Sequence, residues 1–140
     1  MEKTADKKVK ILIVGSVNGA FKKLFALVDS IQKKKGKFDL LLCTGNFFPA
    51  SNDAEKLEEF YEVALSKSAE IPIPTYFVDS TEIIGPFMQR KEMHKFHPNL
   101  HFLGRNGIHT FKDHNNLRIA FVSGKDAEVL GTSVSESIKP

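Results

Sequence analysis

The chain reads Asp39-Leu40-Leu41-Leu42-Cys43-Thr44-Gly45 at the point that decides its fold. Consecutive apolar residues ended by a glycine indicate a strand buried on both faces, which is typical of a parallel sheet. The run from Val9 to Val14, which Gly15 ends, has the same pattern and is also predicted to be buried on both faces. The two runs therefore predict neighbouring strands of an α/β sheet.

A helix is predicted between these strands, from about Ala20 to Lys34, with Gly36 just beyond its end. Its apolar residues recur at spacings of three and four and form one stripe: Phe21, Leu24, Phe25, Val28 and Ile31. A second helix is predicted after Asp53, whose side chain can cap it, and a third short strand at Thr75 to Val78. This alternation predicts a layered α/β fold with right-handed crossovers.

The pattern changes after the third strand. A weaker helix is predicted from Ile84 to Met93, followed by three strand-like runs at Leu100 to Leu103, Ile108 to Phe111 and Leu117 to Val122. Asn106-Gly107 predicts a hairpin turn between the first two runs, and Asp113 to Asn116 predicts a second turn. This half is therefore expected to be antiparallel or mixed.

The length of 140 residues fits one domain. We expect a flexible basic N-terminus at residues 1–8, the folded domain at residues 9–130 and a loose, serine-rich end at residues 131–140. Cys43 is the only cysteine, so no internal disulfide is possible and a reducing compartment is expected. No run resembles a signal peptide or a membrane span, which predicts an intracellular protein that does not enter membranes.

The net charge is +3, and lysines gather in two places: Lys7, Lys8 and Lys10, and then Lys33, Lys34, Lys35 and Lys37. Such clusters can contact phosphates or serve nuclear import. The alternative is that the second cluster only complements the carboxyl end of the first helix. Arg105 joins the second cluster as a candidate contact for RNA or a partner.

Three loops follow the predicted parallel strands, at Gly15 to Gly19, Gly45 to Pro49 and Asp79 to Glu82. Ligands of open parallel sheets bind at the carboxyl ends of the strands, so these loops form the candidate site. The first loop opens onto a helix N-terminus, where backbone N–H groups can bind a phosphate. Mononucleotide binding is therefore one alternative, although the complete P-loop and dinucleotide motifs are absent.

At these loops the chain resembles the metallophosphoesterase superfamily, and more closely the amino-terminal domain of the CwfJ family of Cwf-nineteen-like splicing factors. The resemblance runs in order from about Val9 to Gly124. It implies a calcineurin-like metallophosphoesterase fold, a layered α/β structure with a mixed sheet and flanking helices, truncated relative to active members. The stretches that carry it are Gly15-Ser16-Val17-Asn18-Gly19, Ser30-Ile31-Gln32-Lys33-Lys34, Phe38 to Phe48, and Leu103 to Ile108.

Active members carry acidic residues and histidines at these loops as ligands of two metal ions. Here Ser16 stands at the first aspartate position, Asn18 at the histidine position and Asn46 at the position of the bridging aspartate. The later motif reads Asp79-Ser80-Thr81, and Glu82 alone keeps its expected type. Neutral Ser and Asn side chains cannot offset the charge of two metal ions, so we expect no metal, no cofactor and no catalysis. The alternative is a divergent phosphodiesterase that binds one metal through Glu82, Asp79 and a histidine.

Five histidines are present: His94, His97, His101, His109 and His114. His97 and His101 have the spacing of helical metal ligands, but Pro98 and Asn99 between them argue against a helix. We therefore expect surface or turn histidines.

Two adjacent aromatic residues, Phe47 and Phe48, precede Pro49 where active relatives place a polar segment. Neighbouring side chains of an extended segment point in opposite directions, so we expect one ring in the core and the other available to a partner or to RNA. The alternative is that both rings belong to the core.

The family resemblance implies a nuclear protein of the late, disassembling spliceosome that acts in intron lariat turnover. The implied partners are spliceosomal proteins and the enzyme that debranches excised lariats, with RNA as a further candidate. It also implies a carboxy-terminal region related to histidine-triad folds, which is not in this sequence.

Overall fold

The computed structural model describes residues 8–49, 53–66, 69–88 and 93–124. The predicted serine-rich end at residues 131–140 lies outside them, as does the predicted flexible N-terminus except for Lys8, which is exposed. Five strands form the main sheet in the order β1-β2-β3-β5-β4. They are β1 (Ile11–Gly15), β2 (Leu40–Thr44), β3 (Thr75–Phe77), β4 (His94–His97) and β5 (Leu100–Phe102).

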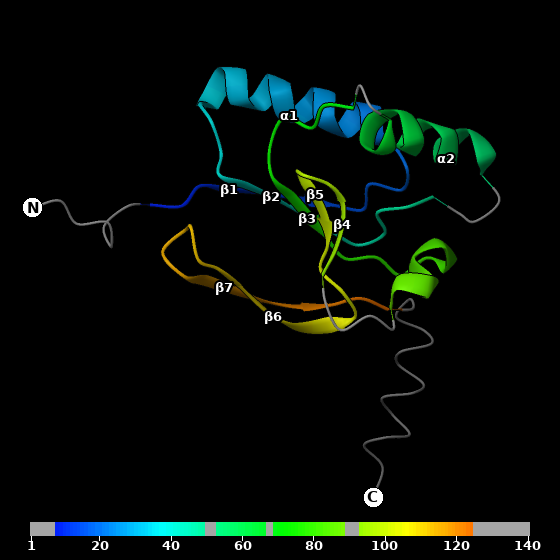
Figure 1. The fold of residues 1–140 in the computed structure, drawn as a ribbon. Helices are drawn as coiled ribbons and strands as arrows, with labels where there is room; N and C mark the ends of the chain where they lie inside the picture. Colours follow the sequence, from blue (N-terminus) through cyan, green and yellow to red (C-terminus); the bar gives the residue numbers. More distant parts are fainter. Residues whose placement is uncertain (1–7, 50–52, 67–68, 89–92, 125–140) are drawn as a thin grey trace, which may run out of the picture.

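The main sheet is mixed. β1, β2, β3 and β5 run parallel, and β4 runs antiparallel to β5. Helices α1 (Phe21–Lys35) and α2 (Ala54–Phe60) cover one face, whereas the hairpin of β6 (Asn106–Phe111) and β7 (Leu117–Val122) lies on the other side (Figure 1). The predicted α/β fold with a mixed sheet and flanking helices is therefore confirmed.

Both predicted helices are present. α1 ends at Gly36, whose φ of 91° favours glycine and whose N–H donates to the Gln32 carbonyl at 2.9 Å. Asp53 caps α2 as predicted, because its side chain accepts a hydrogen bond from the Lys56 N–H at 3.2 Å. A π-helical turn, η2 (Tyr61–Leu65), continues α2. No described helix has the length and apolar character that crossing a membrane requires.

The prediction that the first strand is buried on both faces is wrong. β1 lies at the end of the strand order, and the side chain of Ile13 is 63% exposed. α1 covers one face of β1, where Leu12 and Val14 pack partly against the core. The apolar run thus belongs to an edge strand that has the composition of a central one.

The hairpin predicted at Asn106-Gly107 is also wrong. Both residues are the first of β6, which pairs with β7 in a separate two-stranded sheet, whereas β5 belongs to the main sheet. The turn at Asp113 to Asn116 is confirmed and places Asn115 and Asn116 at positive φ, a conformation that asparagine tolerates.

The weak helix predicted from Ile84 to Met93 is shorter than expected. A 3₁₀ helix, η3 (Glu82–Phe87), contains Pro86, which has no N–H to extend an α-helical ladder. Residues 89–92 of the predicted helix lie outside the described part of the chain. Strand β4 was missed, since His94-Lys95-Phe96-His97 has little β-branched or apolar character.

The core between the helices and the main sheet is aromatic. Phe47 stacks on Phe77 of β3 with 3.9 Å between ring centroids, and Phe21 of α1 lies 5.1 Å from the Phe47 ring. Phe48 contacts Phe60 of α2 at 4.8 Å in an edge-on arrangement. Aromatic pairs favour offset-stacked and edge-on geometries and contribute stability beyond the area that they bury.

Candidate functional site

The three loops at the carboxyl edge meet as the sequence predicted, and backbone hydrogen bonds join the first loop to the second. The N–H groups of Ser16, Asn18 and Gly19 donate to the carbonyls of the second loop, at Thr44 (2.8 Å), Asn46 (2.9 Å) and Phe47 (3.0 Å) respectively. The first loop is therefore fastened along the second.

This fastening uses the donors that a phosphate would need. The N–H of Ala20 donates to the Val17 carbonyl at 3.0 Å, so of the backbone N–H groups from Ser16 to Ala20 only that of Val17 is left without a backbone acceptor. A phosphate-binding loop presents several free N–H groups to its ligand. The loop from Ser16 to Ala20 therefore offers few free N–H groups to a phosphate, which weighs against the mononucleotide alternative.

Asp79, at the carboxyl end of β3, is buried and saturated with hydrogen bonds. Its Oδ1 accepts from the N–H groups of Phe47 (2.6 Å) and Phe48 (3.0 Å). Its Oδ2 accepts from the N–H (3.0 Å) and the hydroxyl (2.5 Å) of Thr81. A carboxylate can be buried when several donors offset its lost hydration, and these donors occupy the oxygens that a metal would use.

Two of the other positions of the predicted metal-ligand pattern, Ser80 and Asn46, contact each other. The Ser80 hydroxyl donates to the side-chain oxygen of Asn46, which stands at the predicted metal-bridging position. Ser16 lies against Gly45, whose φ is 72°, and a Cβ on that glycine would collide with the Ser16 hydroxyl. Asn18 and Glu82 are exposed. Ser80, Asn46 and Ser16 thus make contacts within the loops themselves.

The β6–β7 hairpin also reaches this site, through a residue that sequence reasoning missed. The Ser123 hydroxyl donates to the Gly104 carbonyl at 2.7 Å and accepts from the Asp79 N–H at 3.3 Å. Gly124 N–H donates to the Asp79 carbonyl at 3.2 Å. Asp79 and Ser123 are separated by 44 positions, so no local pattern could have indicated the contact. The remaining cavity of about 210 Å³ is lined by Gly45, Val78, Asp79, Ser80, Val122, Ser123 and Gly124.

Within residues 8–49, 53–66, 69–88 and 93–124, no group of three or more His, Cys, Asp and Glu side chains is arranged to hold a metal ion. His97 and His101 lie on β4 and β5 rather than on a helix. The His101 ring stacks on Tyr76 with 4.7 Å between centroids, and His109 of β6 lies 5.7 Å from the same tyrosine. His101 and His109 are therefore packed between the sheets, which differs from the expectation of surface or turn histidines.

Burial changes the proton affinity of several side chains. It lowers the pKa of His101, opposed in part by the contact with the Pro98 carbonyl, and it lowers the pKa of His109. Burial raises the pKa of Cys43 to about 12, which keeps the thiol protonated and unreactive at neutral pH.

The expectation that one ring of the Phe47-Phe48 pair is available to a partner is wrong. Phe47 is 0% and Phe48 is 2% exposed. The two N–H groups donate to the same Asp79 oxygen, so this segment turns rather than extends and both rings enter the core. The alternative, that both are core residues, is confirmed.

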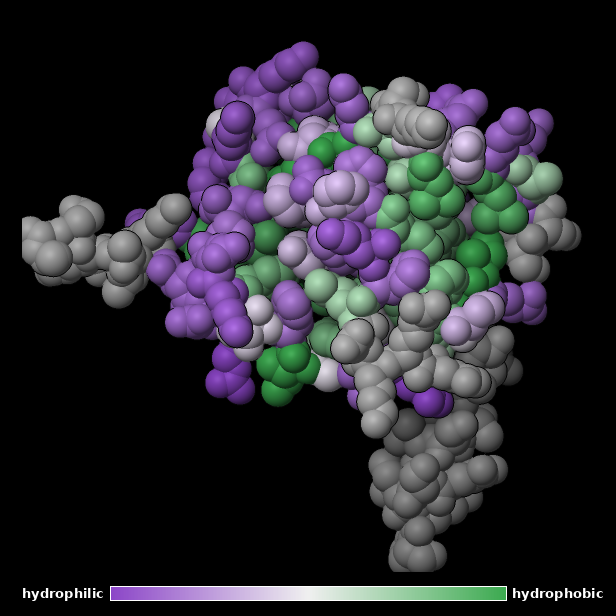
Figure 2. Space-filling view, viewed as in Figure 1, coloured by the Kyte–Doolittle hydropathy of each residue, from purple (hydrophilic) through white to green (hydrophobic). Residues whose placement is uncertain are grey.

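The candidate basic contacts are divided between opposite ends of the fold. Lys33, Lys34, Lys35 and Lys37 lie around the carboxyl end of α1, next to the amino end of β2, where hydrophilic side chains gather on the surface (Figure 2). Arg105 follows β5 at the carboxyl edge, and its carbonyl accepts a hydrogen bond from the Ser123 N–H at 2.6 Å. The structure therefore does not bring Arg105 and the lysines together.

The lysines of the two sequence clusters meet in space. The Lys10 Nζ donates to the Lys35 carbonyl at 3.3 Å and lies 5.1 Å from the centre of the Phe38 ring. Lys33 forms an exposed ion pair with Asp29 at 3.3 Å. We call the exposed lysines Lys8, Lys10, Lys33, Lys34, Lys35 and Lys37 the basic end of the domain.

No family model matches the sequence. The chain is 38% identical over 124 residues to CWF19-like protein 1 of Homo sapiens and 34% identical over 132 residues to CWF19-like protein 1 homolog of Drosophila melanogaster. These alignments cover 88% and 89% of this chain but only 22% of each relative. It is also 40% identical over 77 residues, 55% of this chain and 12% of the relative, to zinc finger CCCH domain-containing protein 64 of Arabidopsis thaliana. The similarity over most of the chain supports kinship with the CWF19-like proteins.

Proposed function

We propose that this chain, as a relative of the CWF19-like proteins, is a non-catalytic, metallophosphoesterase-like binding domain of a splicing factor. Its work is in late spliceosome disassembly and intron lariat turnover in the nucleus, where it binds spliceosomal proteins, the lariat debranching enzyme or RNA. The names of the relatives support the splicing role. The chain spans 22% of those relatives, so the proposal concerns this domain and not their whole length.

The observation that carries the non-catalytic part is the hydrogen bonding of Asp79. Phosphodiester hydrolysis on a metal centre needs charged ligands whose lone pairs face the metal. Asp79 directs both oxygens to Phe47, Phe48 and Thr81, and Ser80 pairs with Asn46. These contacts hold the loops together in the place of a metal centre.

The rival is a divergent phosphodiesterase that binds one metal through Glu82, Asp79 and a histidine. It requires Asp79 to exchange its hydrogen bonds for a metal, with the N–H groups of Phe47 and Phe48 left buried and unpaired. Buried N–H groups without an acceptor cost on the order of 1–3 kcal/mol each. This cost is the reason for preferring the binding domain.

Metal titration separates the two functions. Melting temperatures measured with and without Mn²⁺, Mg²⁺ and Zn²⁺ should agree, because a metal that binds the native state raises the melting temperature by mass action. A generic phosphodiester should remain uncleaved in the same solutions. Glu82→Gln is the control: a metal-dependent rise that this substitution abolishes would establish the rival.

Partner binding needs a separate measurement. Purified lariat debranching enzyme titrated into the chain in a calorimeter should give saturable heat if that partner is correct. An RNA oligonucleotide, titrated into the chain in a separate experiment, tests RNA as the partner. If neither ligand gives a signal, the debranching enzyme and RNA are overturned as partners of this domain, and only the spliceosomal proteins of the proposal remain.

A further inference from the structure

Among the described residues, β1 leaves one edge of the main sheet open. It is the terminal strand of the order β1-β2-β3-β5-β4, and β2 is the one described strand that pairs with it. Backbone groups along a strand point alternately to its two sides. The Lys10 carbonyl accepts from Leu40 N–H, and Ser16 N–H donates to the Thr44 carbonyl, so the even-numbered residues face β2. The N–H and C=O groups of Ile11, Ile13 and Gly15 therefore point away from the sheet.

Nothing in the sequence of β1 blocks a further strand. Edge strands of soluble proteins are commonly protected by charged side chains, proline or bulges. Residues Ile11 to Gly15 contain no charge and no proline, and their pairing with β2 is regular throughout. Ile13 is 63% exposed on the face of β1 away from α1.

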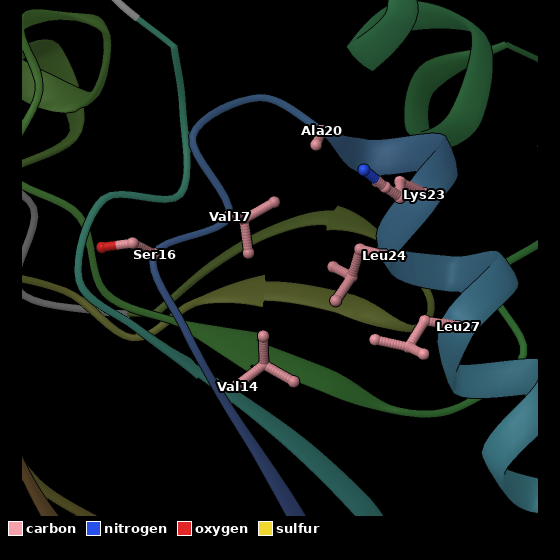
Figure 3. A pocket seen from close by; sticks show the side chains of 7 residues that line it. All are labelled: Val14, Ser16, Val17, Ala20, Lys23, Leu24 and Leu27. Atoms are coloured by element: carbon pink, nitrogen blue, oxygen red, sulfur yellow. The ribbon is translucent and has the colours of Figure 1, made fainter.

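The other face of this edge adjoins an apolar groove. A cavity of about 240 Å³ lies between β1 and α1 and is lined by Val14, Ser16, Val17, Ala20, Lys23, Leu24 and Leu27. Figure 3 shows Leu24 and Leu27 of α1 directed toward the side of Val14. Leu27 is 51% exposed. An added strand would thus find apolar neighbours on both of its faces.

The charges around the groove indicate which kind of segment would bind there. Lys23 is the one ionisable side chain in the lining, and no described acidic residue forms an ion pair with it. Lys8 and Lys10 lie at the amino end of the same edge and are exposed. An extended segment that carries acidic residues beside its apolar ones would place opposite charges at both ends of β1.

We infer that the β1 edge and its groove form a docking surface for an extended, acidic and apolar segment of a partner protein, which adds to the sheet as a strand. Main-chain hydrogen bonds to Ile11, Ile13 and Gly15 hold such a segment, and alternate side chains enter the groove beside Leu27. The groove shares Ser16 with the candidate site, but the outward backbone groups of Ile11 and Ile13 and the side chain of Leu27 belong to neither its loops nor its cavity, so the inference does not depend on whether the domain is catalytic.

The test uses the isotopically labelled chain and two short synthetic peptides. In both peptides valine and threonine alternate, with glutamate at both ends of one and lysine at both ends of the other. The glutamate peptide should shift the NMR signals of β1 and of the groove residues and slow hydrogen exchange at the amides of Ile11, Ile13 and Gly15. The lysine peptide should bind roughly tenfold more weakly, as loss of about 1.4 kcal/mol would give.

Two matched pairs of variants localise the effect. Ile13→Pro removes an outward N–H without touching a bond to β2, whereas Ile13→Thr keeps that N–H; only the proline should weaken binding, by roughly tenfold or more. In the second pair, Leu27→Glu places a charge in the groove and should abolish peptide binding. Leu65→Glu changes a similarly exposed leucine on the π-helical turn and should leave peptide binding unchanged.

Three results would overturn the inference. The first is unchanged peptide affinity in Ile13→Pro. The second is a dimer in sedimentation that Ile13→Pro dissociates, which would make a second copy the occupant. The third is slow hydrogen exchange at the Ile11, Ile13 and Gly15 amides of the monomer without peptide. That result would mean that another part of the same chain already pairs with the β1 edge.

Discussion

The carboxylate of Asp79 joins two loops that are more than 30 positions apart in the sequence. Asp79→Asn keeps the size of the side chain but leaves one oxygen to face four donors. We expect the free energy of unfolding to fall by about 2–4 kcal/mol, since hydrogen bonds to a charged group contribute about 1.5–3 kcal/mol each.

Urea denaturation of Asp79→Asn measures this loss. The control is Glu82→Gln, an exposed carboxylate three positions away, which should change the stability by no more than about 0.5 kcal/mol. Equal stability of the two variants would mean that Asp79 does not hold the loops.

Phe47 and Phe48 are both core residues, and this changes what their substitution should do. Phe47→Ala and Phe48→Ala should each lower the free energy of unfolding by about 3–5 kcal/mol, because each leaves a cavity among aromatic neighbours. Chemical denaturation gives the value directly, and leucine at the same positions should give a smaller loss of the same sign. A variant of either residue that retains full stability would contradict the burial of that ring.

At the scale of elements, the β6–β7 hairpin docks on the main sheet through a cluster of rings. Tyr76 contacts His101 at 4.7 Å and Phe111 at 4.8 Å, and His109 contacts Phe111 at 4.5 Å. The Nδ1 atom of His101 is buried without a hydrogen-bond partner. Protonation of these histidines therefore places charge where little solvates it.

The direction of the pH effect follows from the lowered pKa values. Burial holds the pKa of His101 and His109 below the usual 6.5, so the unfolded chain binds protons before the native state does. Stability should therefore be complete above pH 6.5 and decrease as the pH falls from 6.5 toward the folded-state values. The charges of Lys95 and His97 on β4 act on His101 in the same direction.

Urea denaturation between pH 7.5 and pH 5 measures this decrease. His101→Phe keeps an aromatic ring against Tyr76 but does not titrate, so it should reduce the slope of stability against pH. An unchanged slope in His101→Phe, with His109 still present, would show that His101 does not couple protonation to docking of the hairpin.

At the scale of the whole molecule, the basic end lies opposite the carboxyl edge, which makes Arg105 a control for the lysines. If the basic end binds RNA through phosphates, log affinity should fall linearly with log salt concentration. Replacing Lys33, Lys34 and Lys35 by alanine should reduce that slope by about 0.7 for each phosphate that the variant no longer neutralises. Fluorescence anisotropy with a labelled single-stranded RNA measures the slope.

Arg105→Ala should leave the salt dependence of RNA binding unchanged, because this residue lies beyond the opposite ends of the strands. Equal slopes for the parent chain and the lysine variant would mean that these lysines do not contact RNA phosphates. Their role would then be to interact favourably with the dipole at the carboxyl end of α1. A reduced slope in Arg105→Ala alone would move the RNA surface to the carboxyl edge.

The sequence by itself determined the first half of the fold. The helix period before Gly36, the cap at Asp53 and the apolar run at Leu40 are local signals, and α1, α2 and β2 follow them closely. The meeting of the three loops could also be predicted, because parallel strands end at the same edge of a sheet.

Only the tertiary structure decided which strands pair after β3 and what the candidate site contains. β5 joins the main sheet and β6 does not, although the two are separated by the short segment 103–105. Asp79 receives donors from Phe47 and Phe48 and contacts Ser123, all distant in the sequence. Periodicity indicates which face of an element is apolar, whereas these outcomes depend on hydrogen bonds and ring packing between residues that meet only when the chain is folded.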